Sequence, residues 1–177
     1  MRLVLVGAHS TGKTTLLQAL KLKHKELIIK DGISRPIHKC SAKLGLYPEE
    51  TQTLISELTQ FIWESDKDIP NLCQTRSPLD CISYSKALGY KQLTKEGESY
   101  LSSWAINNTI FCYIPIEFPI VDDGVRPTDV EFQKKIDDNL KFYLDLYKIK
   151  YERISGTIEE RVLQIENILL NYEKSSY

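Results

Sequence analysis

The sequence has few of the features that mark a secreted, membrane-bound or disulfide-stabilised protein. Its 177 residues include four cysteines, with no Cys-x-x-Cys pair and no histidine at metal-ligand spacing. We therefore expect reduced thiols rather than a zinc site or a disulfide framework. No apolar run approaches the ~20 residues that span a bilayer. Because a strand is expected from residue 2 onward, no room remains for a signal peptide. These features predict a cytoplasmic protein.

An excess of charge of one sign is also lacking. The 23 lysine and arginine residues nearly balance the 24 aspartate and glutamate residues, for a net charge of −1. This balance gives no overall attraction to nucleic acid, although a local basic cleft remains compatible with it. Linkers, internal repeats and low-complexity segments are absent as well. A chain of this length without an internal boundary is expected to form a single domain over residues 1–177.

One complete motif lies near the start of the chain. Residues 7–14 read Gly-Ala-His-Ser-Thr-Gly-Lys-Thr, which matches the phosphate-binding P-loop pattern G-x-x-x-x-G-K-[ST]. An apolar, β-branched run over 2–6 precedes the motif, and apolar residues recur at helical spacing after it. Strand, loop and helix therefore follow one another in the order that a P-loop requires.

The spacing of this motif suits the chemistry of a triphosphate. Gly7 and Gly12 permit the close backbone approach that a side chain would obstruct. The loop amides and the first turn of the helix supply N–H donors and the positive end of the helix dipole. We expect Lys13 to reach the β- and γ-phosphates and Thr14 to coordinate Mg²⁺. The residues predicted to bind ATP here are Gly7, His9, Ser10, Thr11, Gly12, Lys13, Thr14 and Thr15.

The rest of the chain predicts alternating strands and helices. Further strands are expected at 26–30, 71–75, 109–116 and 151–154, and helices at 13–24, 51–64, 79–88, 95–107, 130–147 and 158–172. Residues 37–48 are expected to be irregular or weakly helical, because the residue before Pro36 avoids the α region. In the helix over 51–64, the expected apolar face consists of Leu54, Leu58, Phe61 and Ile62. Alternation of this kind predicts an α/β fold with a parallel sheet covered on both faces and ligands at the carboxyl ends of its strands.

A P-loop alone does not distinguish a switch, a motor and a kinase. The Asn-Lys-x-Asp and Asp-x-x-Gly strings of GTPase switches are absent, and so is the Asp-Glu pair typical of motor ATPases. Charged residues occur in each loop expected near the phosphate site. A small kinase is the class that remains.

Five short segments occur in a characteristic order. They are residues 7–14, Asp-Gly-Ile-Ser-Arg-Pro at 31–36, Arg-Ser-Pro-Leu-Asp at 76–80, Asp-Gly-Val-Arg at 123–126 and Gly-x-x-x-Glu-Arg at 156–161. This succession resembles the small P-loop nucleoside and nucleotide kinases, above all the branch with nicotinamide-riboside kinase domains and phage-encoded P-loop kinases. The resemblance implies a three-layer fold with a five-stranded parallel sheet in the order 2-3-1-4-5. It also implies phosphoryl transfer from ATP–Mg²⁺ to a hydroxyl group.

The same resemblance implies roles for two carboxylates. Asp31 stands where such kinases place an acidic residue near the acceptor hydroxyl, and it could accept the proton or hold Mg²⁺ through water. The family usually has an acidic residue before the arginine that follows the third strand, but this chain has Thr75 before Arg76. That departure favours Asp31 as the base and leaves Asp80 as a second candidate.

Arginines complete the predicted site. Arg35 and Arg76 are expected to bind the acceptor together with Asp80. Arg126 lies in a polar loop and is expected to stabilise charge that develops on the transferring phosphoryl group. Arg161 is expected to stack on adenine or to contact a phosphate.

Three functions remain compatible with the sequence. The leading one is ATP-dependent phosphorylation of a hydroxyl on a nucleoside, a nucleotide or a related nucleic-acid component. A second keeps the chemistry but places the hydroxyl on a polynucleotide, either a DNA end or a hydroxymethylated base as in phage DNA modification. A third is a regulatory module that binds ATP without transferring phosphate, which Thr75 in place of an acidic residue would favour.

Overall fold

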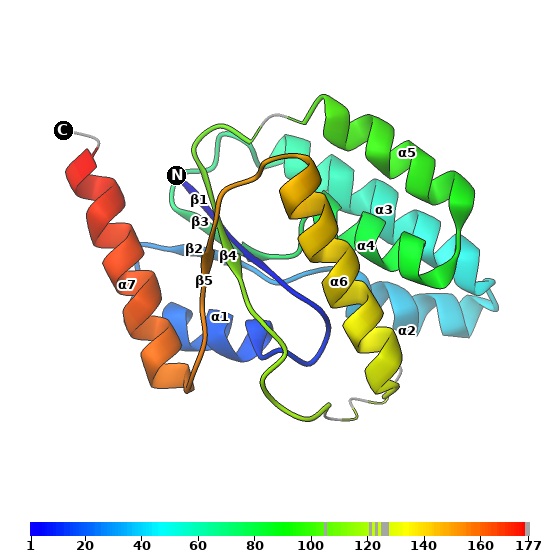
Figure 1. The fold of residues 1–177 in the computed structure, drawn as a ribbon, viewed down its shortest axis with the longest axis horizontal. Coiled ribbons are helices and arrows are strands. Elements are labelled where there is room, and N and C mark those ends of the chain that lie inside the picture. Colours follow the sequence, from blue (N-terminus) through cyan, green and yellow to red (C-terminus); the bar gives the residue numbers. More distant parts are fainter. Residues whose placement is uncertain (105, 121, 123, 125–127, 176–177) are drawn as a thin grey trace.

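The computed structural model describes residues 1–177 except 105, 121, 123, 125–127 and 176–177. The described residues form one parallel five-stranded sheet in the order β2-β3-β1-β4-β5, with seven helices around it (Figure 1). The strands are β1 (Arg2–Val6), β2 (Ile28–Lys30), β3 (Leu72–Thr75), β4 (Thr109–Tyr113) and β5 (Tyr151–Arg153). The helices are α1 (Lys13–Lys23), α2 (Ser34–Leu44), α3 (Pro48–Ser65), α4 (Pro78–Leu88), α5 (Lys91–Ser102), α6 (Val130–Leu146) and α7 (Ile158–Ser175). The predicted strand order is confirmed.

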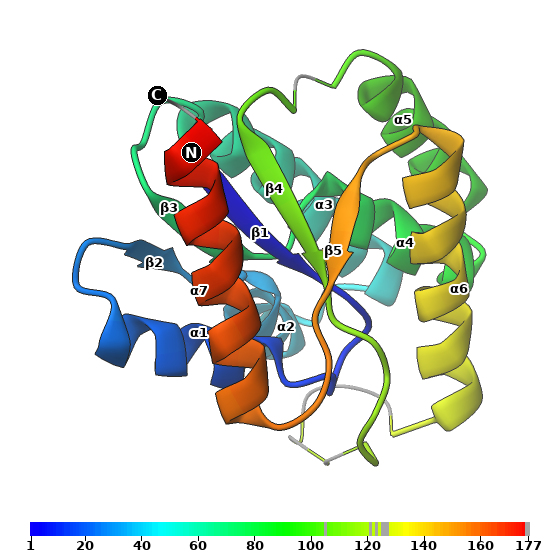
Figure 2. The same ribbon diagram turned by 60° about the vertical axis from the view of Figure 1, so that its left-hand side comes forward.

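The central strand β1 is buried along its whole length, as its apolar sequence predicts. Its side chains alternate between two cores on opposite faces of the sheet. Leu3 and Leu5 pack with helices α1 and α7, whereas Val4 and Val6 pack with α3, α4, α5 and α6. Figure 2 shows α1 and α7 together in front of one face of the sheet, with α4, α5 and α6 on the other side. The fold therefore has the three layers that the resemblance implied.

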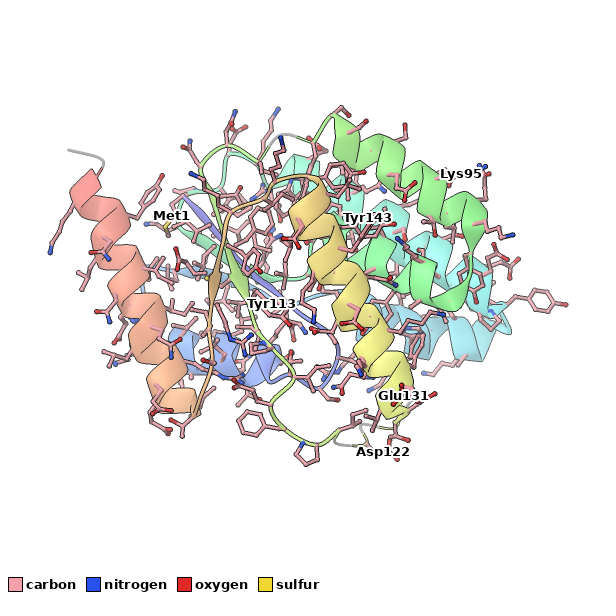
Figure 3. The ribbon with its side chains drawn as sticks, viewed as in Figure 1. Met1, Lys95, Tyr113, Asp122, Glu131 and Tyr143 are labelled. Atoms are coloured by element: carbon pink, nitrogen blue, oxygen red, sulfur yellow. The ribbon has the colours of Figure 1, made fainter. Side chains whose placement is uncertain are left out.

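Helix α6 packs on the sheet with one apolar face. Ile136, Leu140 and Leu144 are buried. Tyr113 and Tyr143 lie in the interior between the sheet and α6 (Figure 3). The hydroxyl group of Tyr113 donates to the buried carboxylate of Asp137 over 2.8–2.9 Å, so the polar end of this core residue is satisfied.

The prediction for residues 37–48 was wrong, because Ser34–Leu44 form a regular helix. Pro36 is the third residue of α2. The first N–H groups of a helix have no acceptor within it, so a proline there removes no hydrogen bond. The helix ends at Gly45, whose φ of 68° is the left-handed conformation that glycine adopts readily at this position.

The predicted apolar face of the next helix was also wrong. Leu54, Leu58 and Phe61 are 38%, 42% and 69% exposed. The face of α3 that packs on the molecule instead carries Thr51, Gln52, Ile55, Thr59 and Trp63. Polar residues are tolerated on it because α4 supplies partners: the Gln52 amide donates to the carbonyl of Cys81 over 3.1 Å and to Ser85 Oγ over 3.2 Å. Smaller differences concern β2, β4 and β5, which are shorter than expected, and α5, which begins at Lys91.

The four cysteines are free thiols in this structure; Cys40 is exposed and the other three are buried. Burial raises the pKa of the Cys81 thiol to about 11, so this group stays protonated at neutral pH. Within the part of the chain that the structure describes, no helix is both long and apolar enough to cross a membrane.

Candidate active site

The P-loop wraps around the amino end of α1. Gly7, Ser10 and Gly12 have positive φ values of 154°, 59° and 88°, and backbone turns of this kind form concavities of N–H groups that bind anions. A Cβ atom on Gly7 would lie 2.5 Å from the carbonyl oxygen of Ile114 at the end of β4. Only glycine therefore fits where the loop leaves β1. The first turn of α1 adds its free N–H groups to this anion-binding concavity.

Lys13 lies at the mouth of the loop. Its Nζ donates to the carbonyl oxygen of Gly7 over 2.7 Å, to the carbonyl of Ala8, and to Thr11 Oγ1 over 3.2 Å. The ammonium group is thus held against loop carbonyls on the lining of a cavity, and its predicted contact with phosphate stays a prediction.

Asp31, Thr14 and Thr75 meet where β2 and β3 end. The Thr14 hydroxyl lies 3.3 and 3.4 Å from the two carboxylate oxygens of Asp31. The Thr75 hydroxyl donates to Asp31 Oδ1, and the Gly32 amide donates to the same oxygen over 2.8 Å. The threonine that replaces the expected acidic residue therefore holds Asp31 in place.

This arrangement also fits a magnesium ion. A hydroxyl and a carboxylate that face each other are the hard oxygen donors that Mg²⁺ accepts while it keeps phosphate and water ligands. In the described part of the chain, no group of three or more His, Cys, Asp or Glu side chains forms a metal site. Thr14 and Asp31, whose oxygens lie 3.3 and 3.4 Å apart, are residues that could hold Mg²⁺ with a bound triphosphate.

A cavity of about 290 Å³ joins the P-loop to these side chains. Arg35 lines it and donates from Nη1 to Thr14 Oγ1 over 3.3 Å. The structure thus brings together predicted residues from α1, the ends of β2 and β3, and α2. The lining residues are Ser10, Thr11, Gly12, Lys13, Thr14, Thr15, Asp31, Gly32, Arg35, Thr75 and Arg76.

Arg76 has an unusual backbone conformation for a non-glycine residue, with φ of 73°. Its guanidinium lies 5.1 Å from the ring centre of Tyr84, and its side-chain carbons crowd Gly32, where a Cβ atom would come within 2.8 Å. Burial opposes its charge, but Tyr84 and Asp80 more than offset that effect and raise the pKa of Arg76. A strained residue whose positive charge is favoured in this way is typical of a functional site.

Asp80 is buried at the start of α4, where it caps the helix. It is 2% exposed, and its Oδ2 accepts from the amide and the hydroxyl of Ser77 over 2.8 and 3.0 Å. These contacts form a capping box at the start of α4. Asp80 does not line the P-loop cavity. Its negative charge contributes to raising the pKa of Arg76.

Arg161 lies beneath the P-loop. It is 1% exposed and donates to the carbonyl oxygens of Thr11 over 2.7 Å and Gly156 over 2.9 Å, and to the Glu117 carboxylate over 2.8 Å. Burial would raise the pKa of Glu117, but its bonds to the Gly156 amide and Arg161 lower it. The predicted contact of Arg161 with ATP stays a prediction, and the geometry gives this side chain a role in holding the loop.

His9 and Arg126 complete the predicted set. The His9 ring is buried beside Phe132, with Nδ1 3.1 Å from the Tyr84 hydroxyl, and the Gln133 amide donates to its carbonyl over 2.6 Å. Its side chain therefore anchors the P-loop to α4 and α6. Arg126 lies outside the described residues.

A second cavity, of about 340 Å³, lies between α2, α3 and α4, and Arg76 lines it as well. The hydroxyls of Ser34 and Ser41 border it, are buried, and have no hydrogen-bond partner among the described residues. Other lining residues include His38, Gln52, Ile55, Tyr84, Tyr90 and Phe132. Sequence analysis missed this cavity, because its residues are spread over four helices and form no local motif.

The strand order and the P-loop after the first strand define the fold of the small P-loop nucleotide kinases. A family model described as AAA domain matches residues 2–161. The chain therefore belongs to this AAA-domain family.

Solved structures share the fold over nearly the whole chain. Deoxyadenosine kinase from M. mycoides superposes with a TM-score of 0.73 and 12% identity, covering 97% of this chain and 100% of that one. Thymidylate kinase from Candida albicans superposes with a TM-score of 0.74 and 17% sequence identity, covering 97% of this chain and 92% of that one. Thymidylate kinase from Ehrlichia chaffeensis superposes with a TM-score of 0.58 and 14% sequence identity, covering 96% of this chain and 98% of that one. At these identities the likeness is one of fold. Comparison with curated protein sequences gives no match.

Proposed function

We propose that this protein is a kinase that transfers the γ-phosphoryl group of ATP to a hydroxyl of a nucleoside, a nucleotide or a related nucleic-acid component. The observation that carries the proposal is the meeting of two cavities at Arg76, one lined by the P-loop and the other by apolar and hydroxyl-bearing side chains. Such a pair of adjoining cavities suits a phosphate donor and an organic acceptor. The fold shared with nucleoside and nucleotide kinases supports it.

In the proposed mechanism the chain positions two reactants and stabilises charge. The P-loop amides and Lys13 bind the triphosphate. Mg²⁺ would be held by Thr14 and, through water, by Asp31, and would neutralise charge on the phosphate oxygens. Asp31 accepts the proton of the acceptor hydroxyl, and Thr75 keeps its carboxylate oriented. Arg35 and Arg76 bind oxygens of the phosphoryl group or acceptor, and we assign Arg126 the same electrostatic role.

The second cavity suits the base of a small acceptor. Tyr84, Tyr90 and Phe132 supply aromatic surface, on which a planar ring packs well. The amide nitrogen of Gln52 is occupied by Cys81 and Ser85, so its carbonyl oxygen is the part left for a donor group on the ligand.

A polynucleotide acceptor receives less support. Lys21, Lys23, Lys39 and Lys43, which would contact phosphates of a polymer, line neither cavity. Lys23 pairs with Glu166 over 2.7 Å. We therefore favour a small molecule over a DNA end or a modified base.

The test is transfer of labelled γ-phosphate to a panel of nucleosides, mononucleotides, and plain or hydroxymethylated oligonucleotides at two salt concentrations. We expect label in a nucleoside or nucleotide, with shallow salt dependence. Label confined to oligonucleotides and lost at high salt would establish the polymer kinase, because polymer binding releases counterions. ATP binding without acceptor-dependent ADP formation across the panel would favour the regulatory module.

A further inference from the structure

One contact joins the P-loop to the second cavity. His9 belongs to the P-loop sequence, but its side chain is buried and it lines neither the P-loop cavity nor the second cavity. Its Nδ1 lies 3.1 Å from the hydroxyl oxygen of Tyr84, which belongs to α4 and lines the second cavity. His9 therefore acts on its neighbours in the protein and not directly on a ligand in either cavity.

Arg76 is the second partner of Tyr84. Its guanidinium carbon lies 5.1 Å from the centre of the Tyr84 ring, and the Tyr84 hydroxyl favours the positive charge through a hydrogen bond. Arg76 lines both cavities, and its φ of 73° is a conformation that persists where surrounding contacts hold it. Tyr84 thus connects an arginine that reaches both cavities with the loop expected to bind phosphate.

Helix α6 holds the P-loop and Tyr84 relative to each other. It lies beside α4, the helix that carries Tyr84 (Figures 1 and 2). The side-chain amide of Gln133 donates to the carbonyl oxygen of His9 over 2.6 Å. The ring of the preceding residue, Phe132, packs against both His9 and Tyr84, with centroid separations of 6.1 and 6.4 Å. Several contacts of one helix therefore fix the distance between the histidine and the tyrosine.

We propose that Tyr84 and His9 are positioning residues that hold the Arg76 guanidinium at a fixed place relative to the P-loop. The inference rests on the proposed function, in which Arg76 binds oxygens of the phosphoryl group or of the acceptor. Transfer between two bound reactants is sensitive to displacements of about 1 Å. A hydroxyl that contacts both the arginine and the loop keeps the guanidinium aligned with the phosphate being transferred. Its loss therefore lowers turnover more than it weakens binding of either reactant.

Steady-state kinetics with the acceptor identified in the panel test the pair. Tyr84→Phe removes the hydroxyl and keeps the ring, so we expect kcat to fall about tenfold or more while both KM values stay within about threefold of the parent. His9→Leu should have the same effect, whereas His9→Asn, which offers a hydrogen-bonding group near the place of Nδ1, should retain most of the activity. Tyr147→Phe removes a hydroxyl that donates to the carbonyl of Glu98 and lines neither cavity. This matched control should leave kcat unchanged, and circular dichroism verifies that each variant is folded.

A double variant tests whether the tyrosine acts through the arginine. Arg76→Lys should lower kcat at least as much as Tyr84→Phe, and the two together should be little slower than Arg76→Lys alone, because the aligned guanidinium is already gone. Independent, multiplicative effects of the two substitutions would overturn the proposal.

Two results with Tyr84→Phe alone would also overturn it. One is a kcat within about threefold of the parent. The other is a rise in the KM for the acceptor with kcat unchanged, because the hydroxyl would then be a contact with the ligand. A parent that transfers phosphate to no acceptor of the panel would instead overturn the proposed function, and this inference with it.

Discussion

Among single residues, Lys13 is the one most directly involved in the proposed chemistry. Its ammonium bonds to the P-loop, and in the proposed mechanism it compensates phosphate charge as the γ-phosphoryl group is transferred. We predict that Lys13→Ala lowers kcat/KM by orders of magnitude while the melting temperature stays near that of the parent. Lys21→Ala on the same helix is the control. Activity within about threefold of the parent in Lys13→Ala would contradict the assignment.

Asp31 and Asp80 should respond differently to the same substitution. Asp31 lines the P-loop cavity, whereas Asp80 is bound to Ser77 in a capping box. We predict that Asp31→Asn lowers kcat more than the affinity for ATP, with little loss of stability. Asp80→Asn should mainly lower the free energy of unfolding, by about 1 kcal/mol for the weakened cap. Steady-state kinetics and urea unfolding of both variants separate these effects; loss of turnover in Asp80→Asn alone would reverse the roles.

Arg161 should act through the shape of the P-loop. Its guanidinium bonds at once to Thr11, Gly156 and Glu117, which a lysine cannot reproduce because it lacks the planar fork. We predict that Arg161→Lys raises the KM for ATP several-fold or more and leaves the KM for the acceptor nearly unchanged. Equal effects on both constants, or none, would argue against a role in holding the loop.

At this scale the sequence was informative where residues act through a local motif. Lys13, Thr14 and Asp31 could be placed together because parallel strands end at one edge of the sheet. Gln52, Ser34 and Tyr84 could not, since their meeting depends on how helices pack. The position of Arg161 depends in the same way on a carbonyl group 150 residues earlier in the chain.

Helix α6 shows how one capping residue supports an element. Asp129 accepts from the amides of Glu131 and Phe132 over 2.8 and 3.2 Å. We predict that Asp129→Ala lowers the free energy of unfolding by about 1 kcal/mol. Asp138→Ala, which removes a surface ion pair with Lys141, should change it by less than about 0.5 kcal/mol. Urea unfolding of both variants gives the comparison, and equal losses would contradict the capping contribution.

In helices α2 and α3, the sequence pattern failed to predict the helix itself and the buried face, respectively. Pro36 argued against a helix, yet at the third position it costs no hydrogen bond. In α3 the leucines favoured one face, but Trp63 and Ile55 on another are buried, together with Gln52 and Thr59. A polar helix face can be buried where neighbouring elements supply hydrogen-bond partners, and α4 supplies them to Gln52. The strand order followed from the family resemblance, and the helices without such conflicts, α1, α6 and α7, followed from periodicity.

Over the whole molecule, Glu166 links the end of α1 to α7. Its carboxylate accepts from Lys23 over 2.7 Å and lies 2.9 Å from His24 Nε2, and the bond to Lys23 in particular lowers its pKa from 4.5. A lowered folded-state pKa stabilises the fold above pH 4.5, and this contribution is lost as pH falls through the lower value. We predict that Glu166→Gln is less stable than the parent at pH 7 and that the difference shrinks toward pH 3. Urea unfolding across this range checks the prediction; a constant difference would contradict it.

The two outer strands of the sheet have a consequence for how this molecule meets other copies of itself. β2 and β5 are three residues long, and they carry Lys30, Glu152 and Arg153. Short, charged edges offer too few free backbone groups to template a strand from another chain. The native fold is therefore protected against growth of its sheet into fibrils through strand pairing at these edges.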